Sequence, residues 1–256
     1  MSSESSAPIL QRFARYLRLV VQLFAGLLTV AFLFPFYGRG RRWRAVQNWS
    51  RGVVRSAGVG VRVKGTVPEH GARIMAVSNH VSWLDVQVLH SVWNVRFVAK
   101  SEVRRWPFIG WLSARTGTLF IDRANRRHAA RINSDIHQAF ADGDAVAVFP
   151  EGTTTRGDKL LRFHASLLQP AIDAQALIVP VAIRYTDDAG NRHPAAAYVD
   201  DMSLMESLAA IVRAPLICAE VHILPAIQTQ GRTRRELAQA SHASIAAALS
   251  LPAVSS

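Results

Sequence analysis

The chain is poor in the residues that build disulfides, metal clusters and flexible linkers. Cys218 is the single cysteine among 256 residues, which excludes an internal disulfide and a cysteine-cluster zinc site. It lies in the apolar run Leu216–Leu224, where a buried, unreactive thiol is expected. No two histidines show convincing ligand spacing, so no metal site is expected. Glycine and proline are not enriched, which argues against a large disordered region.

Acidic residues are also scarce: 18 Asp and Glu stand against 30 Lys and Arg, a formal charge of +12. Such an excess indicates a polyanionic partner, either nucleic acid, an anionic membrane or phosphorylated substrates. Position favours the membrane, because arginines bracket an apolar stretch near the N-terminus, as expected for contacts with lipid headgroups. These arginines are Arg12, Arg15 and Arg18 before the stretch, and Arg39, Arg41, Arg42 and Arg44 after it.

The longest hydrophobic run is Leu19–Phe36, slightly shorter than the about 20 residues that a spanning helix needs. No small-residue cleavage site follows it, so a signal peptide is not favoured. A basic segment with two tryptophans, Arg41–Ser56, comes next. We therefore expect residues 1–57 to form two helices, joined near Pro35–Gly40, that anchor the protein to one leaflet. A single spanning helix is the alternative.

Residues 58–256 are expected to form one α/β domain, because half of the whole chain is hydrophobic, which is enough for a full core. Apolar, β-rich runs alternate with helix-like segments, which indicates a layered, mixed but largely parallel sheet flanked by helices. The expected strands are Val61–Gly65, Arg73–Ser78, Val95–Ala99, Thr118–Ile121, Ala145–Phe149, Leu177–Tyr185 and Leu216–Leu224. The expected helices are Asp85–Trp93, Asn125–Ala141, His164–Ala174, Met202–Ala214 and Arg232–Leu249. Sites in such sheets form at the carboxyl ends of strands.

One motif at a strand end pairs a histidine with a carboxylate. The run Asn79–Asp85 places His80 where a strand stops and Asp85 five residues later. One continuous helix would not align the two side chains, whereas a turn followed by a helix start brings Asp85 back to the imidazole. The carboxylate would then fix the tautomer and leave the other ring nitrogen as a base, with a substrate hydroxyl in place of an enzyme nucleophile. A capped helix start with a structural histidine remains the alternative.

Two further motifs follow strands and suit anionic groups. In Phe149–Gly157, glycine allows close backbone approach, amides and hydroxyls can hold phosphate or an oxyanion, and Arg156 adds charge. In Gly117–Arg123, Arg123 offers a guanidinium for a phosphate or carboxylate. A plain turn and a surface ion pair are the respective alternatives.

In this order and spacing, the motifs resemble the glycerolipid acyltransferase family, of the 1-acyl-sn-glycerol-3-phosphate acyltransferase type. The resemblance runs from about Gly60 to about Tyr185. The matching positions are His80 and Asp85, Arg123, Phe149 to Thr153, the buried strand Ile178–Ile183, Lys100 and the stretch Trp106–Trp111. Members of the family also share an N-terminal membrane-associated helical pair.

The resemblance implies transfer of a fatty acyl group from acyl-CoA or acyl-ACP to the free hydroxyl of a lysolipid, with 1-acyl-sn-glycerol-3-phosphate the first candidate. It implies His80 and Asp85 as the catalytic pair, and no metal or other cofactor. The residues expected to bind substrate are Arg123, Glu151, Gly152, Thr153, Arg156 and Lys100. Glu151 could bind, orient or cap. The expected location is the cytoplasmic face of a bacterial inner membrane, with membrane lipids as partners and no nucleic acid.

One departure bears on the acceptor. Phosphatidate-forming members commonly have Arg then Ser after the Gly-Thr pair, where this chain has Thr154 and Thr155. The run Leu161–Pro170 also looks closer to members that acylate other lysolipids, such as lyso-ornithine lipid.

A hydrolase is disfavoured because no Gly-x-Ser-x-Gly motif is present. Two alternatives to an enzyme are a basic membrane- or nucleic-acid-binding protein without catalysis and an inactive adaptor. Both would leave the His80/Asp85 pair unexplained.

Overall fold

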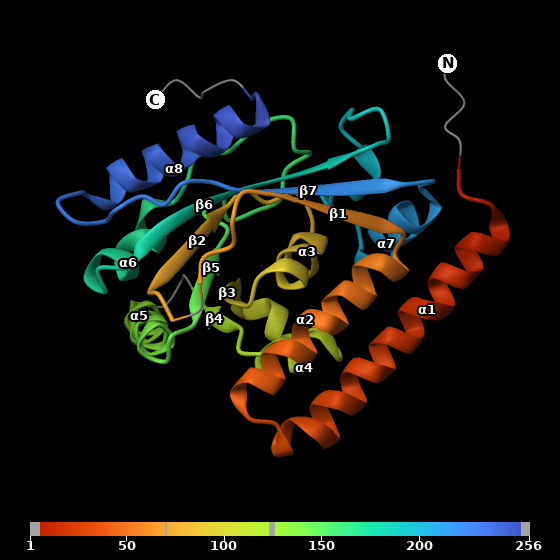
Figure 1. Ribbon diagram of the computed structural model, residues 1–256, viewed down its shortest axis with the longest axis horizontal. Coiled ribbons are helices and arrows are strands. Elements are labelled where there is room, and N and C mark those ends of the chain that lie inside the picture. Colours follow the sequence, from red (N-terminus) through yellow and green to blue (C-terminus); the bar gives the residue numbers. More distant parts are fainter. Residues whose placement is uncertain (1–5, 70, 123–125, 252–256) are drawn as a thin grey trace.

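The computed structural model describes residues 6–69, 71–122 and 126–251, with residues 126–131 described by their backbone alone. Seven strands form one sheet in the order β1-β7-β6-β2-β5-β3-β4 (Figure 1). The strands are β1 (Val59–Lys64), β2 (Ile74–Ser78), β3 (Val95–Lys100), β4 (Leu119–Ile121), β5 (Ala145–Val148), β6 (Leu177–Thr186) and β7 (Ile217–Ile223). The helices are α1 (Ile9–Leu28), α2 (Arg39–Ser56), α3 (Leu84–Val92), α4 (Ile109–Arg115), α5 (Arg126–Ala141), α6 (Gln169–Asp173), α7 (Leu204–Arg213) and α8 (Arg234–Leu249).

The sheet is mixed but mostly parallel, which confirms the predicted fold class. Strands β6, β2, β5, β3 and β4 run parallel to one another. The β6–β7 pair is antiparallel, and β1 pairs with β7 in parallel, so β7 and the edge strand β1 run in the opposite direction. Because β2 and β5 are parallel neighbours, their carboxyl ends meet at the same edge of the sheet. That edge brings the loops after Ser78 and Val148 side by side.

Helices cover both faces of the sheet. On one face, residues of α2, α3 and α7 share an apolar core with the strands; Val54, Leu84 and Ile211 represent these helices. On the other face, residues of α5, α6 and α8 form a second core, with Ile136 and Leu237 buried in it (Figure 1). Strands buried on both faces explain the near-continuous apolar runs in the sequence.

The N-terminal residues form the predicted helical pair. Helix α1 continues through a π-helical turn (Thr29–Leu33) and a 3₁₀ turn (Phe34–Phe36), and α2 then runs back alongside it (Figure 1). The segment Ile9–Phe36 is long and apolar enough to cross a membrane, with a mean hydropathy of 2.2, and 17% of its most apolar window is buried. An apolar helix exposed to this degree supports association with a membrane.

Helix α2 belongs to the core as well as to the helical pair. Its Val54 and the following Ala57 are buried in the same apolar cluster as the strands. The domain boundary predicted between residues 57 and 58 therefore separates two elements that share one core, and removal of residues 1–57 would uncover it.

The structure differs from the sequence predictions at several positions. The expected helix His164–Ala174 is a 3₁₀ turn (Ala165–Leu168) followed by α6, with Pro170 in the first turn of α6. A 3₁₀ turn (Ser101–Arg105) and α4 were not predicted; both are short, and Pro107 separates them. Cys218 is half-buried rather than buried.

Both halves of α1 are tied to the rest of the molecule. Arg15, only 4% exposed, donates hydrogen bonds to the carbonyl oxygens of Val212, Ala214 and Pro215, at distances of 2.6 to 2.9 Å. These carbonyls lie at the C-terminal end of α7, where helical partners are missing. Further along α1, the Trp49 indole nitrogen of α2 donates to the Gln22 carbonyl at 2.7 Å. Helix α1 therefore lies along the protein.

We expect Arg15→Ala to destabilise the fold by about 1.5–3 kcal/mol, because hydrogen bonds to charged groups contribute that much and the carbonyls lose their donor. The free energy of unfolding, measured in detergent, checks this. Arg18→Ala is the control, since Arg18 is exposed on the same helix. Equal effects of the two substitutions would contradict the docking role of Arg15.

Candidate active site

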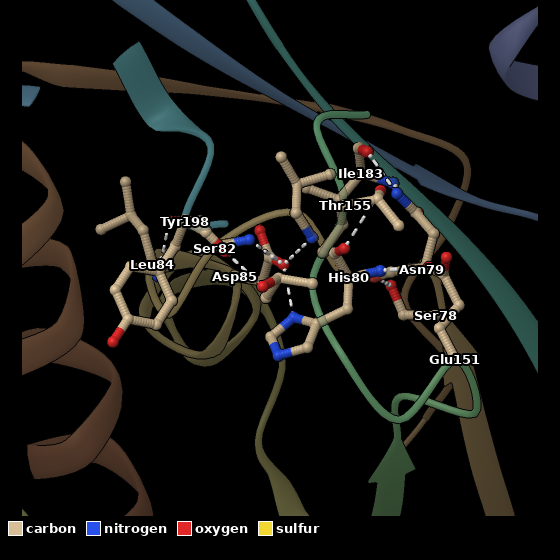
Figure 2. Close-up of polar contacts among 12 residues, drawn as sticks. Ser78, Asn79, His80, Ser82, Leu84, Asp85, Glu151, Thr155, Ile183 and Tyr198 are labelled. Carbon is tan, nitrogen blue, oxygen red and sulfur yellow. Dashed lines mark hydrogen bonds and ion pairs between the residues drawn. The ribbon is translucent and has the colours of Figure 1, made fainter. Parts of the chain in front are cut away.

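The turn after β2 is held in place by an asparagine that extends the sheet. The Asn79 side-chain nitrogen donates to the Ile183 carbonyl at 2.9 Å, and the Ile183 backbone N–H donates to the Asn79 side-chain oxygen at 2.8 Å. The side chain thus replaces a strand residue opposite β6, and it fixes the position of the next residue, His80 (Figure 2).

Asp85 is fully buried and accepts four hydrogen bonds. Its Oδ2 lies 2.8 Å from His80 Nδ1 and accepts the backbone N–H groups of Val81 at 2.7 Å and Ser82 at 2.9 Å (Figure 2). Its Oδ1 accepts the Tyr185 hydroxyl at 2.6 Å. The carboxylate also lies in the first turn of α3, where the helix dipole favours negative charge. A buried carboxylate that accepts hydrogen bonds in this way fixes Nδ1 as the protonated ring nitrogen.

The His80 ring is also held from one side by aromatic stacking. It stacks on Phe149, with ring centroids 3.9 Å apart and planes 11° apart, and Phe149 in turn stacks on Phe97. The side chain is 19% exposed and lines a cavity. With Nδ1 on Asp85, Nε2 is the nitrogen left for a substrate, and it points away from the carboxylate in Figure 2.

The loop after β5 is pinned to the backbone of His80. Glu151 accepts the His80 backbone N–H on Oε1 at 2.8 Å and the Leu161 N–H on Oε2 at 2.8 Å. Thr155 N–H donates to the His80 carbonyl at 2.9 Å. Burial raises the pKa of Glu151 to about 7, and the two backbone N–H donors oppose this rise. Of the roles open to Glu151, binding, orienting or capping, this geometry favours orienting, because both oxygens already hold backbone groups.

A large apolar cavity runs from His80 toward the helical pair. Its volume is about 980 Å³, and its wall includes Leu23, Val30 and Phe34 from the α1 side and Val46 from α2. A cavity of this size and polarity suits a fatty acyl chain.

The structure brings only part of the predicted substrate-binding set to this cavity. Lys100, Gly152 and Thr153 line it together with His80. Arg156 does not, because its exposed guanidinium pairs with Asp200 at 2.9 Å. Arg123 lies outside the described residues.

The candidate donors for an oxyanion are more restricted than predicted. Gly152 has φ +73°, a conformation that suits glycine, but its N–H already donates to the Phe149 carbonyl at 3.1 Å. Thr153 is exposed and lines the cavity. Within the described part of the chain, no group accepts a hydrogen bond from its backbone N–H. The Thr153 amide is therefore the better placed donor.

Tyr185 is the site residue that sequence reasoning missed. It stands at the end of an apolar run, 100 residues after Asp85, with no motif around it. The β2–β6 pairing alone brings it to the carboxylate. Burial, followed by the Asp85 charge, raises the pKa of its hydroxyl well above the ordinary value, so Tyr185 stays a donor. Among residues 6–69, 71–122 and 132–251, no group of three or more His, Cys, Asp or Glu side chains could hold a metal ion.

A histidine oriented by a buried carboxylate, facing an apolar cavity beside a membrane-type helical pair, defines an enzyme that acts on lipid chains. Residues 60–184 match the family model described as Acyltransferase. The chain is 36% identical to a 1-acyl-sn-glycerol-3-phosphate acyltransferase of Neisseria meningitidis over 77% of each chain. It is 34% identical to a lyso-ornithine lipid O-acyltransferase of Pseudomonas aeruginosa over 81% of this chain and 79% of the relative. The chain therefore belongs to the acyltransferase family and acylates a lysolipid.

The fold has a counterpart among solved structures. The 1-acyl-sn-glycerophosphate acyltransferase PlsC from Thermotoga maritima aligns with a TM-score of 0.71 over 94% of both chains, at 20% identity. At this identity the likeness shows a shared fold, and it extends over almost the whole of both chains.

We expect Tyr185→Phe to lower kcat by about five- to thirtyfold while KM for both substrates stays unchanged. The substitution leaves one buried Asp85 oxygen without its donor, at a cost of about 1–2 kcal/mol, and Tyr185 does not line the cavity. Steady-state kinetics on a lysolipid measure the split. A rise in KM with kcat preserved would contradict a role through Asp85.

The pKa of Glu151 predicts how stability depends on pH. Its folded value of about 7 lies above the ordinary value of 4.5, so between these values the folded protein binds more protons than the unfolded chain. The contribution is complete below about 4.5 and is lost as pH rises through about 7. We therefore expect stability to fall more steeply with pH in the wild type than in Glu151→Gln across this window. Chemical unfolding at stepped pH measures both slopes, and parallel slopes would refute the assignment.

Proposed function

We propose that this protein transfers a fatty acyl group from an acyl thioester, carried by coenzyme A or acyl carrier protein, to the free hydroxyl of a lysolipid. The first candidate acceptor is 1-acyl-sn-glycerol-3-phosphate, which would give phosphatidic acid. The observation that carries the proposal is the His80 ring, bound at Nδ1 by buried Asp85 and facing the apolar cavity. A relative named 1-acyl-sn-glycerol-3-phosphate acyltransferase supports the acceptor.

In the proposed reaction, His80 Nε2 takes the proton of the acceptor hydroxyl while the oxygen attacks the thioester carbonyl. Asp85 stabilises the imidazolium that forms. The tetrahedral intermediate collapses, the carbon–sulfur bond breaks, and the proton on Nε2 passes to the leaving thiolate. The chain needs neither an acyl-enzyme nor a metal for these steps.

The surroundings of His80 suit the other parts of the reaction. The Thr153 amide is the proposed donor to the developing oxyanion, because it lines the cavity with its N–H available. The apolar cavity receives an acyl chain, and its wall near Phe34 and Val46, which belong to one buried cluster, would limit the chain length.

Lys100 is the proposed contact for the acceptor phosphate. It lines the cavity at the end of β3, in register with Ile121 of β4, so it lies near the point where the chain continues toward Arg123. Arg123 remains a proposed phosphate ligand, while Arg156 is engaged by Asp200. Thr154 takes the position of the arginine common in phosphatidate-forming members, and its hydroxyl donates to the Tyr198 carbonyl. This difference favours a second candidate acceptor, lyso-ornithine lipid, which relatives with that name also support.

The proposed location is the cytoplasmic face of the bacterial inner membrane, where both thioester donors are made. There the α1–α2 pair would lie in one leaflet, because α1 is docked along the protein at Arg15 and Gln22.

The acceptor is tested by mass spectrometry of lipid products. Full-length protein is incubated with lysophosphatidate, lyso-ornithine lipid and lysophosphatidylethanolamine, each with acyl-CoA or acyl-ACP. Phosphatidic acid as the main product supports the first candidate, and acylated ornithine lipid supports the second. Lys100→Ala should raise KM for lysophosphatidate more than for the zwitterionic acceptor. Release of free fatty acid at an equal rate with and without acceptor would indicate a thioesterase instead.

We expect His80→Ala to reduce kcat by about 10²–10⁴-fold with the fold intact, because a positioned general base contributes that much. Asp85→Asn should also be severe, since an amide nitrogen cannot accept the N–H groups that Asp85 holds. His137→Ala on α5 is the control, because His137 does not line the cavity. Initial rates and circular dichroism check the outcome, and near-normal turnover in either site variant would refute the mechanism.

A further inference from the structure

The connection between β3 and β4 is an ordered, closely packed segment to which the proposed chemistry assigns no role. It consists of the 3₁₀ turn Ser101–Arg105 and α4, and is called here the 101–115 segment. Its two halves pack so closely that a Cβ added at Gly110 would lie 2.2 Å from the Arg104 carbonyl oxygen. The Arg104 guanidinium also lies over the Phe120 ring of β4.

The outer side of this segment combines large aromatic side chains with positive charge. Phe108 is 62% exposed and Trp111 is 38% exposed. Phe108 has φ +59°, a region that bulky residues rarely adopt, so its backbone conformation is imposed by the surrounding structure. Between residues 101 and 115 the chain has three basic residues, all exposed, and one acidic residue, Glu102. The basic residues are Arg104, Arg105 and Arg115.

The 101–115 segment lies against the helical pair and borders the same cavity. Leu112 of α4 is buried in one cluster with Val30 and Phe34. Three exposed apolar side chains from separate elements line the cavity: Leu33 at the end of the α1 side, Phe108 of the segment and Met205 of α7. Since water would oppose such an apolar rim, the mouth of the cavity suits a lipid environment.

We propose that the 101–115 segment is a second membrane-contacting element, which lies in the headgroup region of an anionic leaflet across the cavity mouth from α1. Phe108 and Trp111 enter the interface, and the arginines contact lipid phosphates. The cavity then opens directly into the bilayer, so that the acceptor reaches His80 laterally without crossing water.

Two observations favour a bilayer over an acidic protein such as acyl carrier protein at this surface. Trp111 has the Arg115 guanidinium over its ring, and a tryptophan with arginines beside it is typical of the membrane interface. The surface is also continuous, through Leu33, with the exposed apolar side of α1, where Phe24, Leu28 and Phe32 would lie in the same leaflet.

The test measures depth in the membrane and needs no turnover, so its outcome does not depend on the acceptor. A single cysteine is placed at Trp111→Cys, or at Ala114→Cys if the first variant does not fold, in the full-length Cys218→Ser protein. The cysteine is labelled with an environment-sensitive fluorophore in vesicles of phosphatidylethanolamine and phosphatidylglycerol. Phe24→Cys on α1 and Gln239→Cys on α8 are the bilayer and water references. Blue-shifted emission, quenched by brominated lipid, is expected at position 111 or 114 as at 24. Emission like that at 239 would overturn the proposal.

Charge reversal gives a matched second measurement. Arg104→Glu/Arg105→Glu and Arg234→Glu/Arg235→Glu lower the formal charge equally, but the second pair lies on α8, on the other side of the sheet (Figure 1). The first pair should reduce brominated-lipid quenching of a label at position 114. It should also raise the apparent KM for lysolipid in anionic vesicles about tenfold, while the KM for a dispersed short-chain acceptor stays unchanged. The second pair should change neither. A label that stays in water, together with a KM raised for acyl-ACP alone, would assign the surface to the carrier protein and refute the membrane contact.

Discussion

The site depends on a buried carboxylate whose hydrogen-bond partners all come from the protein. Four hydrogen bonds replace the hydration of Asp85, two from backbone N–H groups, one from Tyr185 and one from His80. Three of these donors lie in the turn after β2, which Asn79 and Glu151 hold in place, and the fourth lies on β6. The imidazole therefore has one orientation and one protonated nitrogen. If any donor were removed, the buried charge would be less stable and the base would lose its alignment.

The sheet supplies the remaining constraints. Because β2 and β5 are parallel neighbours, the His80 turn and the loop after Phe149 leave the same edge, and Glu151 and Thr155 tie them together through the His80 backbone. The Phe149 ring, on the last residue before that loop, supports the imidazole from the side. The helical pair then places an apolar cavity against the exposed side of His80. A base for a lipid hydroxyl is therefore assembled from three segments distant in sequence.

Local patterns predicted the parts of this arrangement that depend on neighbouring residues. The strand-end position of His80 and the helix start after it implied the contact with Asp85, and hydropathy implied the helical pair, both of which the structure shows. Tyr185 could not be found, because its contact with Asp85 arises only from strand order. Arg156 was expected at the site from its closeness to Gly152 in sequence, but the turn directs it to Asp200. The short α4 lacked the length for a periodic signal.

The central claim is that the oriented His80 activates the acceptor for direct attack, without an acyl-enzyme. Intact-protein mass spectrometry after rapid quenching tests it most directly, with full-length protein, an isotopically labelled acyl thioester, and lysolipid either present or absent. The account predicts that the label appears only in the ester product, that its appearance requires the lysolipid, and that the protein mass never increases. A protein species heavier by one acyl group, formed without acceptor and consumed when lysolipid is added, would contradict it.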